Sequence, residues 1–298
     1  MVSSVKKIRS NVDIKTKIDS QSQAFTALRQ YRHRATSYLQ QQDIKHTTGG
    51  IFPKQLIVTI PVYNDAQILA HSVGITNVTL SHFGYNYLLV LADDGSTDAT
   101  YQISRQLSCE NPRLKYVRLA FNQGRGKVLA TAWGRFQGDV FLYFDSDLST
   151  ELKHIPEVVE RILSGYDIVT GSRYLCRSKT TRPPLRRFVS LFYNLVVRAL
   201  FRDGISDHQC GFKGLSKRAV EKLIPLCRDK RWFWDTEMVV IAKKLGYKVS
   251  EIPVEWREMK WTRTPIRRLV KDIYMLGKGL ITLFIRVYLS REIFEKER

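Results

Sequence analysis

Cysteine is scarce in this sequence, and its few cysteines are widely separated. Cys109, Cys176, Cys210 and Cys227 are the only four in 298 residues. They form no CxxC pair, which argues against a zinc ribbon or a thioredoxin-like redox motif. Free thiols in a reducing compartment are the simplest interpretation.

Long apolar runs are also missing. No stretch reaches the roughly 18 uncharged apolar residues that a membrane-spanning helix needs. The nearest candidate, residues 273–289, is interrupted by Lys278 and Arg286. Residues 2–42 are polar and lack the apolar core of a signal peptide. We therefore expect a cytoplasmic protein that is soluble or attached peripherally to the cytoplasmic face of a membrane.

Acidic residues are few compared with basic ones. The sequence has 28 Asp and Glu against 48 Lys and Arg, which gives a net charge of +20. Residues 51–175 carry a net charge of −1, whereas residues 176–232 carry 14 basic and four acidic groups. A basic surface attracts phosphates, whether on nucleic acid, on a nucleotide or on lipid head groups. The uneven distribution indicates two halves with different ligands.

Short apolar runs alternate with longer stretches that have the length of helices. The runs lie at residues 56–60, 87–91, 114–119 and 140–144, and the helical stretches at residues 66–80, 99–109 and 126–136. This alternation predicts an α/β fold with a mostly parallel sheet and helices on both faces. We expect a polar extension at residues 1–50, one α/β domain at residues 51–258 and a basic amphipathic helical region at residues 259–298.

Polar clusters follow all four predicted strands. They are PVYND at 61–65, DDGSTD at 93–98, NQGRGK at 122–127 and DSD at 145–147. Ligands of parallel α/β sheets bind outside the carboxyl ends of the strands. Stability alone would not require acidic residues at that edge, so the four clusters predict a ligand site there.

The DSD cluster is the strongest candidate for a metal site. A turn after the strand would let Asp145 and Asp147 reach one hard cation. Two carboxylates completed by phosphate oxygens are typical of Mg²⁺ or Mn²⁺. An Asp-rich turn without a metal is the alternative interpretation.

The other clusters suit a nucleotide. Asp93 and Asp94 could accept hydrogen bonds from a base or a ribose, although a turn with a helix cap would explain part of this motif. Residues 124–127 resemble a phosphate loop, but they match neither the Walker A nor the dinucleotide pattern. Arg125 and the backbone N–H groups of a helix start could still contact a diphosphate.

Arginine dominates the basic half, where Arg173 precedes a cluster at residues 182–190. Guanidinium groups bind phosphate with two parallel hydrogen bonds. His208 is a candidate base, although a buried structural histidine is the more common case.

In their order and spacing, seven segments resemble family 2 glycosyltransferases of the GT-A fold. They are PVYND, ADDGSTD, NQGRGK, DSD, GSRY, DHQCGFK and WFWDTEM. The resemblance covers about residues 54–260. Residues 207–213 and 251–254 make the chain more similar to dolichyl-phosphate glucosyltransferases than to the mannose enzymes.

The resemblance implies a role for each matching residue. It assigns the binding of the nucleotide-sugar donor to Pro61, Tyr63, Asp65, Asp93, Asp94, Arg125, Asp145 and Lys213. The metal would bind Asp145 and Asp147. The acceptor phosphate would bind Arg173, Arg186 and Ser190, with Arg187 as an alternative to Arg186. It also places Asp235 near the sugar or the acceptor, so that Asp147, Arg173 and Asp235 form the implied catalytic set. Asp65 stands where many family members have Glu.

The implied reaction moves a hexose from a nucleotide-sugar to a polyprenyl or dolichyl phosphate with inversion at the sugar. UDP-glucose is the favoured donor and GDP-mannose the other candidate, with Mg²⁺ or Mn²⁺ as the cofactor. A phosphate nucleophile is already ionised at pH 7, so the reaction needs positioning and charge neutralisation more than a strong base.

Three alternatives concern the partners. The acceptor could instead be the hydroxyl group of a soluble compound or a polysaccharide. Nucleic acid is not expected, because the basic residues are not interleaved with aromatic ones in a stacking platform. Residues 183–203 and 259–290 are expected to lie on a membrane surface, whereas packing on the domain or in a homo-oligomer is the alternative.

Overall fold

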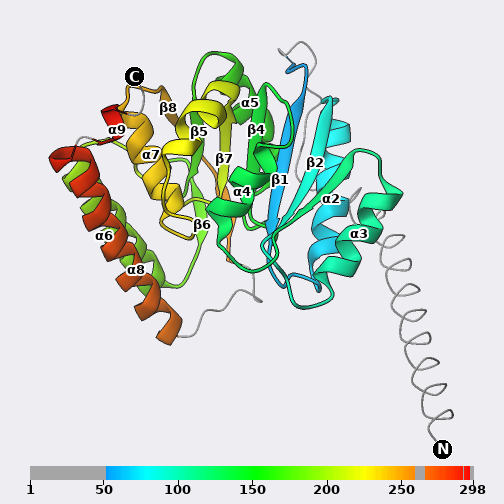
Figure 1. Cartoon of the computed structure of the whole chain (residues 1–298), viewed down its shortest axis with the longest axis horizontal. Helices are drawn as coiled ribbons and strands as arrows, with labels where there is room; N and C mark the ends of the chain where they lie inside the picture. The colour runs from blue at the N-terminus through cyan, green and yellow to red at the C-terminus, as the bar shows by residue number, and fades with distance from the viewer. Residues whose placement is uncertain (1–51, 259–265, 291, 296–298) are drawn as a thin grey trace, which may run out of the picture.

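The computed structural model describes residues 52–258, 266–290 and 292–295 (Figure 1). The side chains of residues 266–273 and 295 are outside this description, and so is the predicted extension at residues 1–50.

A seven-stranded mixed sheet forms the centre of the fold, and its strand order is β3-β2-β1-β4-β7-β5-β8. The strands are β1 (Leu56–Val62), β2 (Tyr87–Asp93), β3 (Leu114–Arg118), β4 (Val140–Phe144), β5 (Ile168–Ser172), β7 (Phe212–Ser216) and β8 (Val249–Pro253). All neighbours are parallel except β7, which runs antiparallel to both β4 and β5. The prediction of a mostly parallel α/β sheet is confirmed.

Helices cover both faces of this sheet. They are α2 (Leu69–His82), α3 (Thr100–Glu110), α4 (Arg125–Trp133), α5 (Ile155–Leu163), α6 (Pro184–Phe201), α7 (Trp234–Lys244), α8 (Ile266–Phe284) and α9 (Glu292–Glu295), with short turns η1 (Leu152–His154), η2 (Ala219–Leu223), η3 (Ile224–Leu226) and η5 (Ile285–Leu289). One apolar core lies between the sheet and α2, α3 and α5, and the other lies beneath α4, α7 and the C-terminal helices.

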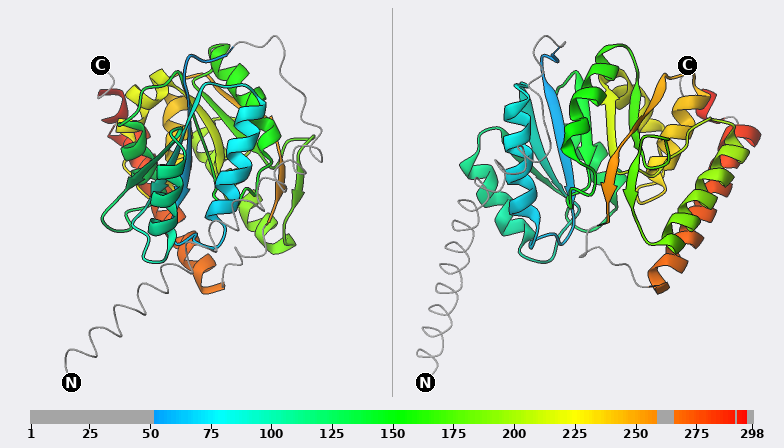
Figure 2. Two further views of the ribbon diagram at one scale, coloured as in Figure 1. Left: turned by 90° about the vertical axis from the view of Figure 1, so that its right-hand side faces the viewer. Right: turned by 180° about the vertical axis from the view of Figure 1, so that it is seen from behind.

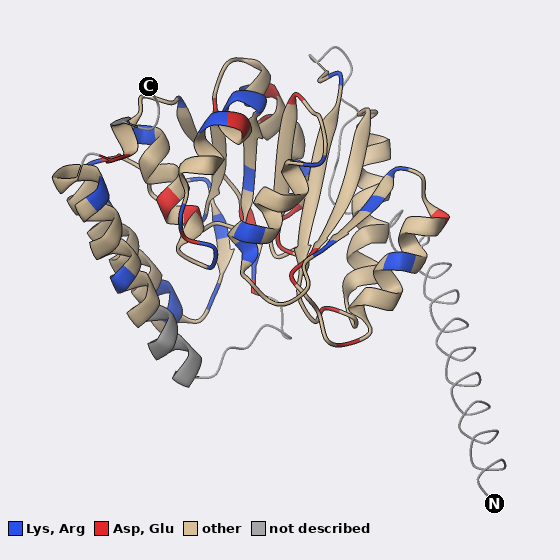
Figure 3. Cartoon of the chain, in the orientation of Figure 1, with Lys and Arg blue, Asp and Glu red and all other residues tan. Residues whose placement is uncertain are grey.

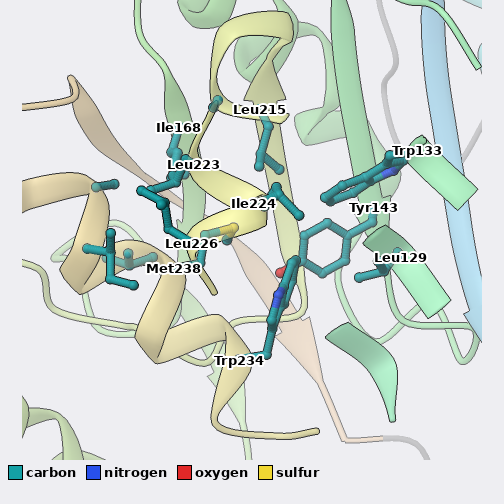
Figure 4. Packing of buried hydrophobic residues seen from close by; sticks show 14 of the residues in the cluster. Leu129, Trp133, Tyr143, Ile168, Leu215, Leu223, Ile224, Leu226, Trp234 and Met238 are labelled. Carbon is teal, nitrogen blue, oxygen red and sulfur yellow. The ribbon is translucent and has the colours of Figure 1, made fainter. Parts of the chain in front are cut away.

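The central strands are apolar on both sides because both faces are covered. In β1, Leu56 and Val58 belong to one core and Ile57 to the other, and all three are fully buried. The second core includes Trp133, Tyr143 and Trp234, whose rings pack together at the centre of Figure 4. These rings join α4, β4 and α7.

A second, two-stranded sheet lies beside the carboxyl end of β4. It pairs β6 (Lys179–Thr181) with β9 (Glu255–Arg257) in parallel. Trp256 of β9 also bridges to Thr150, three residues after Asp147. The small sheet therefore attaches the basic half of the chain to the acidic end of β4.

The C-terminal helices pack on the domain, and α8 lies side by side with α6 (Figures 1 and 2). Phe201 of α6 contacts the rings of Phe284 and Tyr288. Arg286 forms a buried ion pair with Glu237 of α7 and donates to the Leu226 carbonyl at 2.8 Å. In the part of the chain that the structure describes, no helix is long and apolar enough to cross a membrane.

The ion pair between Arg286 and Glu237 predicts a stability effect. Arg286→Ala should lower the free energy of unfolding by about 3–5 kcal/mol, because it leaves a buried carboxylate without its cation. Urea denaturation monitored by circular dichroism measures the change. Arg198→Ala, which removes an exposed arginine from α6, should change it by less than about 0.5 kcal/mol. Equal stability of the two variants would show that the pair does not secure the C-terminal helices.

Candidate functional site

The loops that follow β1, β2 and β4 meet at one edge of the sheet and are linked by hydrogen bonds. The Asn64 N–H donates to Ser96 Oγ at 3.0 Å, and the Asp65 N–H donates to Thr100 Oγ1 at 2.9 Å. Ser146 Oγ donates to the Asp65 carboxylate at 2.8 Å. Three of the predicted strand-end clusters therefore form one continuous surface.

Tyr63 lies on this surface with 44% of its side chain exposed. Pro61 is half-buried near the end of β1. Burial raises the pKa of Asp65, and the negative charges of Asp98 and Asp145 raise it further, although hydrogen bonds to its carboxylate lower it. This part of the surface is open to a ligand.

Asp93 and Asp94 are more enclosed than the sequence predicts. Asp93 is fully buried and accepts from the Ser96 N–H at 2.7 Å, from Ser96 Oγ at 2.6 Å and from the Tyr116 hydroxyl. Asp94 accepts the Gln123 and Gly124 N–H groups at 2.7 and 2.8 Å. Both carboxylates thus shape the loops around the site, and their contact with a nucleoside stays a prediction.

Asp94 fixes the start of α4 together with a glycine. Gly124 has a φ of 109°, and a Cβ at this position would overlap the Lys230 carbonyl. Only glycine fits both constraints. The result is a tight turn that places Arg125 at the first position of α4.

Arg125 bridges two carboxylates at the site. Its Nη1 lies 2.7 Å from Asp145 Oδ1, and its Nη2 pairs with Asp235. Its guanidinium also lies 4.7 Å from the centre of the Trp232 ring. Arg125 therefore holds the carboxyl end of β4 against the start of α7.

Asp235 is fully buried and accepts from three side chains. Besides Arg125, these are the Tyr143 hydroxyl and Lys213, whose Nζ lies 3.3 Å from the carboxylate. Burial favours the neutral acid, but Arg125 and Lys213 hold the pKa of Asp235 below its usual value. Both side chains are 0% exposed. Asp235 positions Arg125 in this structure. The contacts of Asp235 with sugar and of Lys213 with phosphate stay predictions.

Asp145 and Asp147 fit a divalent cation. The chain turns between them, with Leu148 at a φ of 52°, and its N–H donates to the Asp145 carbonyl at 3.1 Å. Gly211 leaves room for the Asp145 carboxylate, since a Cβ there would overlap Oδ2. Burial raises the pKa of Asp145 to about 6; Arg125 opposes the shift, while Asp147 adds to it. Arg125 pairs with Asp145, but no cationic side chain of the described residues pairs with Asp147, so a cation would neutralise the remaining negative charge.

The protein supplies only part of such a coordination shell. Among the described residues, no group of three or more His, Cys, Asp or Glu side chains could hold a metal. Mg²⁺ commonly binds one or two carboxylates and takes its other ligands from substrate phosphates and water. The donor set therefore suits a cation bound together with a diphosphate.

Arg173 is held by a buried carboxylate. Its Nε and Nη2 form a double ion pair with Asp207 at 2.7 and 2.8 Å, and only 7% of its side chain is exposed. Glu251 in turn accepts the N–H groups of Ser206 and Asp207 at 2.8 and 2.9 Å. Asp207 thus fixes the orientation of Arg173, and the binding of an acceptor phosphate by Arg173 stays a prediction.

The other predicted phosphate residues lie in the first turns of α6. Arg186 pairs with Glu258, Arg187 is exposed, and Ser190 is half-buried one turn later. Their binding of an acceptor phosphate stays a prediction.

His208 is a structural residue. It is fully buried, and its ring nitrogens lie 2.8 Å from Asn194 Oδ1 and 2.8 Å from Asp203 Oδ2. The interpretation as a buried histidine is thus the one that fits, and a role as catalytic base is excluded by its enclosure.

The sequence analysis missed several residues of the site. Tyr143, Trp256 and Glu258 each contact a predicted site residue, and Arg182, which belongs to the predicted basic cluster, contacts Trp256. Tyr143 lies within a fully apolar run, and the other three belong to the short strands and turns of the small sheet. In the sequence, only the hydroxyl group of Tyr143 inside the apolar run VFLYF could have indicated a residue of the site.

Solved structures of low sequence identity share this architecture, which is the GT-A fold. Glucosyl-3-phosphoglycerate synthase from Mycobacterium tuberculosis, in complex with UDP, superposes with a TM-score of 0.61 at 16% identity, over 77% of this chain and 80% of that one. A complex of the same enzyme with Mn²⁺, UDP-glucose and phosphoglyceric acid gives a TM-score of 0.60. The predicted fold is confirmed.

The family follows from the sequence comparison. Residues 57–224 match the model of Glycosyl transferase family 2, and the chain belongs to this family. Glycosyltransferase AglD of Haloferax volcanii is 37% identical over 83% of this chain, but the chain spans only 40% of that protein. The dolichyl-phosphate beta-glucosyltransferase of Saccharomyces cerevisiae is 25% identical over 74% of this chain and 75% of its own length. ALG5A of Trichomonas vaginalis, which carries the same enzyme name, is 29% identical over 78% and 74%.

His154 predicts a pH dependence of stability near the site. Its Nε2 accepts the Glu255 N–H of β9 at 3.0 Å, which requires the neutral ring. Burial, helped by Lys153, lowers the pKa of His154 from 6.5 to about 4, although Glu151 and Glu255 oppose this. The unfolded chain therefore takes up a proton before the folded chain does. The stability from this group is fully present above pH 6.5 and is lost as the pH falls towards 4.

His154→Gln should make the free energy of unfolding less dependent on pH in this range, because glutamine can accept the same hydrogen bond without titrating. Urea denaturation at pH values between 7 and 4 compares the two proteins. An unchanged slope in the variant would contradict the assignment.

Proposed function

We propose that this protein transfers a hexose from a nucleotide-sugar to a polyprenyl or dolichyl phosphate, with UDP-glucose favoured over GDP-mannose as the donor. The observation that carries the proposal is the pair Asp145 and Asp147 at the end of β4, next to an arginine-rich segment. The relatives named dolichyl-phosphate beta-glucosyltransferase support the glucosyl donor and the lipid acceptor.

Asp145 and Asp147 would hold Mg²⁺ or Mn²⁺ on the diphosphate of the donor. Such a cation neutralises the charge that develops on the departing diphosphate. Tyr63, Asp65 and Pro61 lie at the open part of the surface where the nucleoside would bind. Arg125, held by Asp235, adds a fixed positive charge beside the diphosphate.

The reaction is a single displacement with inversion. An oxygen of the acceptor phosphate forms a bond to C1 of the sugar while the bond from C1 to the nucleoside diphosphate breaks. The nucleoside diphosphate leaves with the electron pair. Because the phosphate is already ionised, the chain needs no general base, which agrees with the enclosure of His208.

We further propose that α6, α8 and η5 rest on a membrane surface that delivers the lipid. Large apolar side chains are exposed along these elements: Leu185, Phe188, Phe192, Leu195, Tyr274, Ile281 and Leu289. α6 has no acidic residue, and Lys and Arg are visible on both helices in Figure 3. Exposed apolar and basic groups together match an anionic bilayer surface better than a neutral protein partner.

The function is tested by its products. The protein is incubated with UDP-glucose or GDP-mannose, a polyprenyl phosphate and Mn²⁺, and the products are identified by mass spectrometry. Asp147→Asn should reduce transfer by roughly 100-fold or more, because it removes one of two metal ligands. Glu110→Gln, an exposed change on α3, should leave the rate unchanged. Transfer to a sugar hydroxyl but not to the lipid phosphate would refute the proposal, and so would full activity of Asp147→Asn.

The membrane contact is tested with vesicles. Phe188→Glu combined with Phe192→Glu should lower the affinity for vesicles containing anionic lipid by about tenfold or more, since each exposed ring contributes apolar area to the contact. Phe52→Glu, at an exposed position before β1, is the control and should bind as the unmodified protein does. Unchanged vesicle binding, with loss of a dimer in light scattering, would show that a second copy covers this face.

A further inference from the structure

An indole ring of the small sheet lies close to two guanidinium groups. The centre of the Trp256 ring is 5.6 Å from the guanidinium carbon of Arg173 and 5.5 Å from that of Arg182. Asp207 neutralises Arg173. No carboxylate of the described residues forms an ion pair with Arg182, so the stack carries one unbalanced positive charge.

Unsatisfied polar atoms gather around this stack. Nε and Nη1 of Arg182 are buried and have no hydrogen-bond partner among the described residues. The same is true of the Tyr174 hydroxyl and of Oε2 of Glu258. Native proteins leave few buried polar groups unpaired, and each exception calls for an explanation such as a missing ligand.

The stack lies beside the metal carboxylates. Trp256 bridges to Thr150, and the Arg257 N–H donates to the Ser149 carbonyl at 2.8 Å. These hydrogen bonds attach the stack to the residues that directly follow Asp147. An anion bound at Arg182 would therefore lie beside the strand that contacts the residues after Asp147.

The carboxylate of Glu258 is an anionic group that already lies at this basic cluster. Its Oε1 pairs with Arg186, and its N–H donates to the Thr181 carbonyl, next to Arg182. One carboxylate oxygen is thus engaged while the other is buried without a partner. The carboxylate satisfies this basic cluster only in part.

We propose that Arg182 binds the phosphate of the acceptor together with Arg186, and that Glu258 occupies this anion position until the phosphate displaces it. The inference rests on the proposed function and deepens it, since it names the residues that recognise the acceptor. Arg182 and Arg186 together offer the planar donor arrays that suit a phosphate dianion.

The electrostatics of Arg182 agree with this assignment. Burial lowers its pKa, and the positive charge of Arg173 lowers it further, whereas Tyr174, Glu258 and Asp207 oppose the shift. A bound phosphate dianion would supply the missing negative charge and so raise the pKa of Arg182. The exchange of a carboxylate for a phosphate also keeps the cluster occupied by negative charge throughout.

Substitution of Arg182 tests the binding role. With farnesyl phosphate as a short acceptor, Arg182→Ala should raise the KM for the acceptor by roughly 10- to 100-fold, because hydrogen bonds to a charged group are lost. The KM for the nucleotide-sugar should stay within about twofold. Arg182→Lys keeps the charge without the planar fork, so its KM for the acceptor should lie between those of the unmodified protein and of Arg182→Ala. Arg135→Ala removes an exposed arginine at the far end of α4 and is the control.

Substitution of Glu258 tests the displacement. Glu258→Gln removes the competing charge and should lower the KM for farnesyl phosphate several-fold with an unchanged KM for the donor. A raised KM for the acceptor would show that Glu258 supports the cluster and does not compete with phosphate, which would overturn this part of the inference. An acceptor KM unchanged in Arg182→Ala would overturn the role of Arg182.

A direct binding measurement separates this inference from the proposed function. Calorimetry gives the affinity of farnesyl phosphate for the intact protein without a donor. If the protein transfers no sugar to a prenyl phosphate yet binds it with a loss in Arg182→Ala, the proposed reaction is wrong and the phosphate site stands. If transfer occurs and Arg182→Ala binds as tightly as the unmodified protein, the function stands and the site is wrong.

Discussion

The edge of the sheet that carries the candidate site depends on the interactions of one buried carboxylate, that of Asp235. It accepts from Arg125 at the start of α4, from Tyr143 in β4 and from Lys213 in β7. Two cations and a hydroxyl group compensate the cost of burying one negative charge. Without this centre, Arg125 and Lys213 would repel each other, and only the direct ion pair with Asp145 and the contact with Trp232 would hold the Arg125 side chain.

The acceptor side uses the same principle with another carboxylate. Asp207 holds Arg173 by two hydrogen bonds, and Glu251 of β8 fixes the backbone of Asp207. In both halves, a fully enclosed acid positions an arginine next to the place where a phosphate would bind. These two buried acids thus fix the positions of Arg125, Lys213 and Arg173.

Much of the donor half could be predicted from the sequence because its elements are local and periodic. The apolar runs of β1, β2 and β4 are too short for helices and are followed by turn residues. The predicted helix at residues 126–136 ends earlier, at Trp133, because Gly134 follows as the cap. Asp145 and Asp147 could be assigned to the carboxyl edge from the end of one strand alone.

The acceptor half was less predictable because its contacts join distant segments. Arg173 and Asp207 meet only because β5 and the loop before β7 lie side by side, which no spacing in the sequence reveals. β7 reads FKGLS, without a long apolar run, and its antiparallel direction was not expected. A buried ion pair and an open phosphate ligand use the same residue types, so the sequence could not separate the two roles of an arginine.

The insertion of β7 between β4 and β5 has a consequence for how this fold can vary. Pairing of β5 with β7 encloses residues 173–211, the segment that carries β6 and α6, in one long loop. The entropy of closing a loop grows slowly with its length, by only about 0.6 kcal/mol for each doubling. This segment can therefore gain or lose residues at little thermodynamic cost while the register of the sheet stays fixed. The length of the segment and the stability of the sheet are thus nearly independent quantities in this architecture.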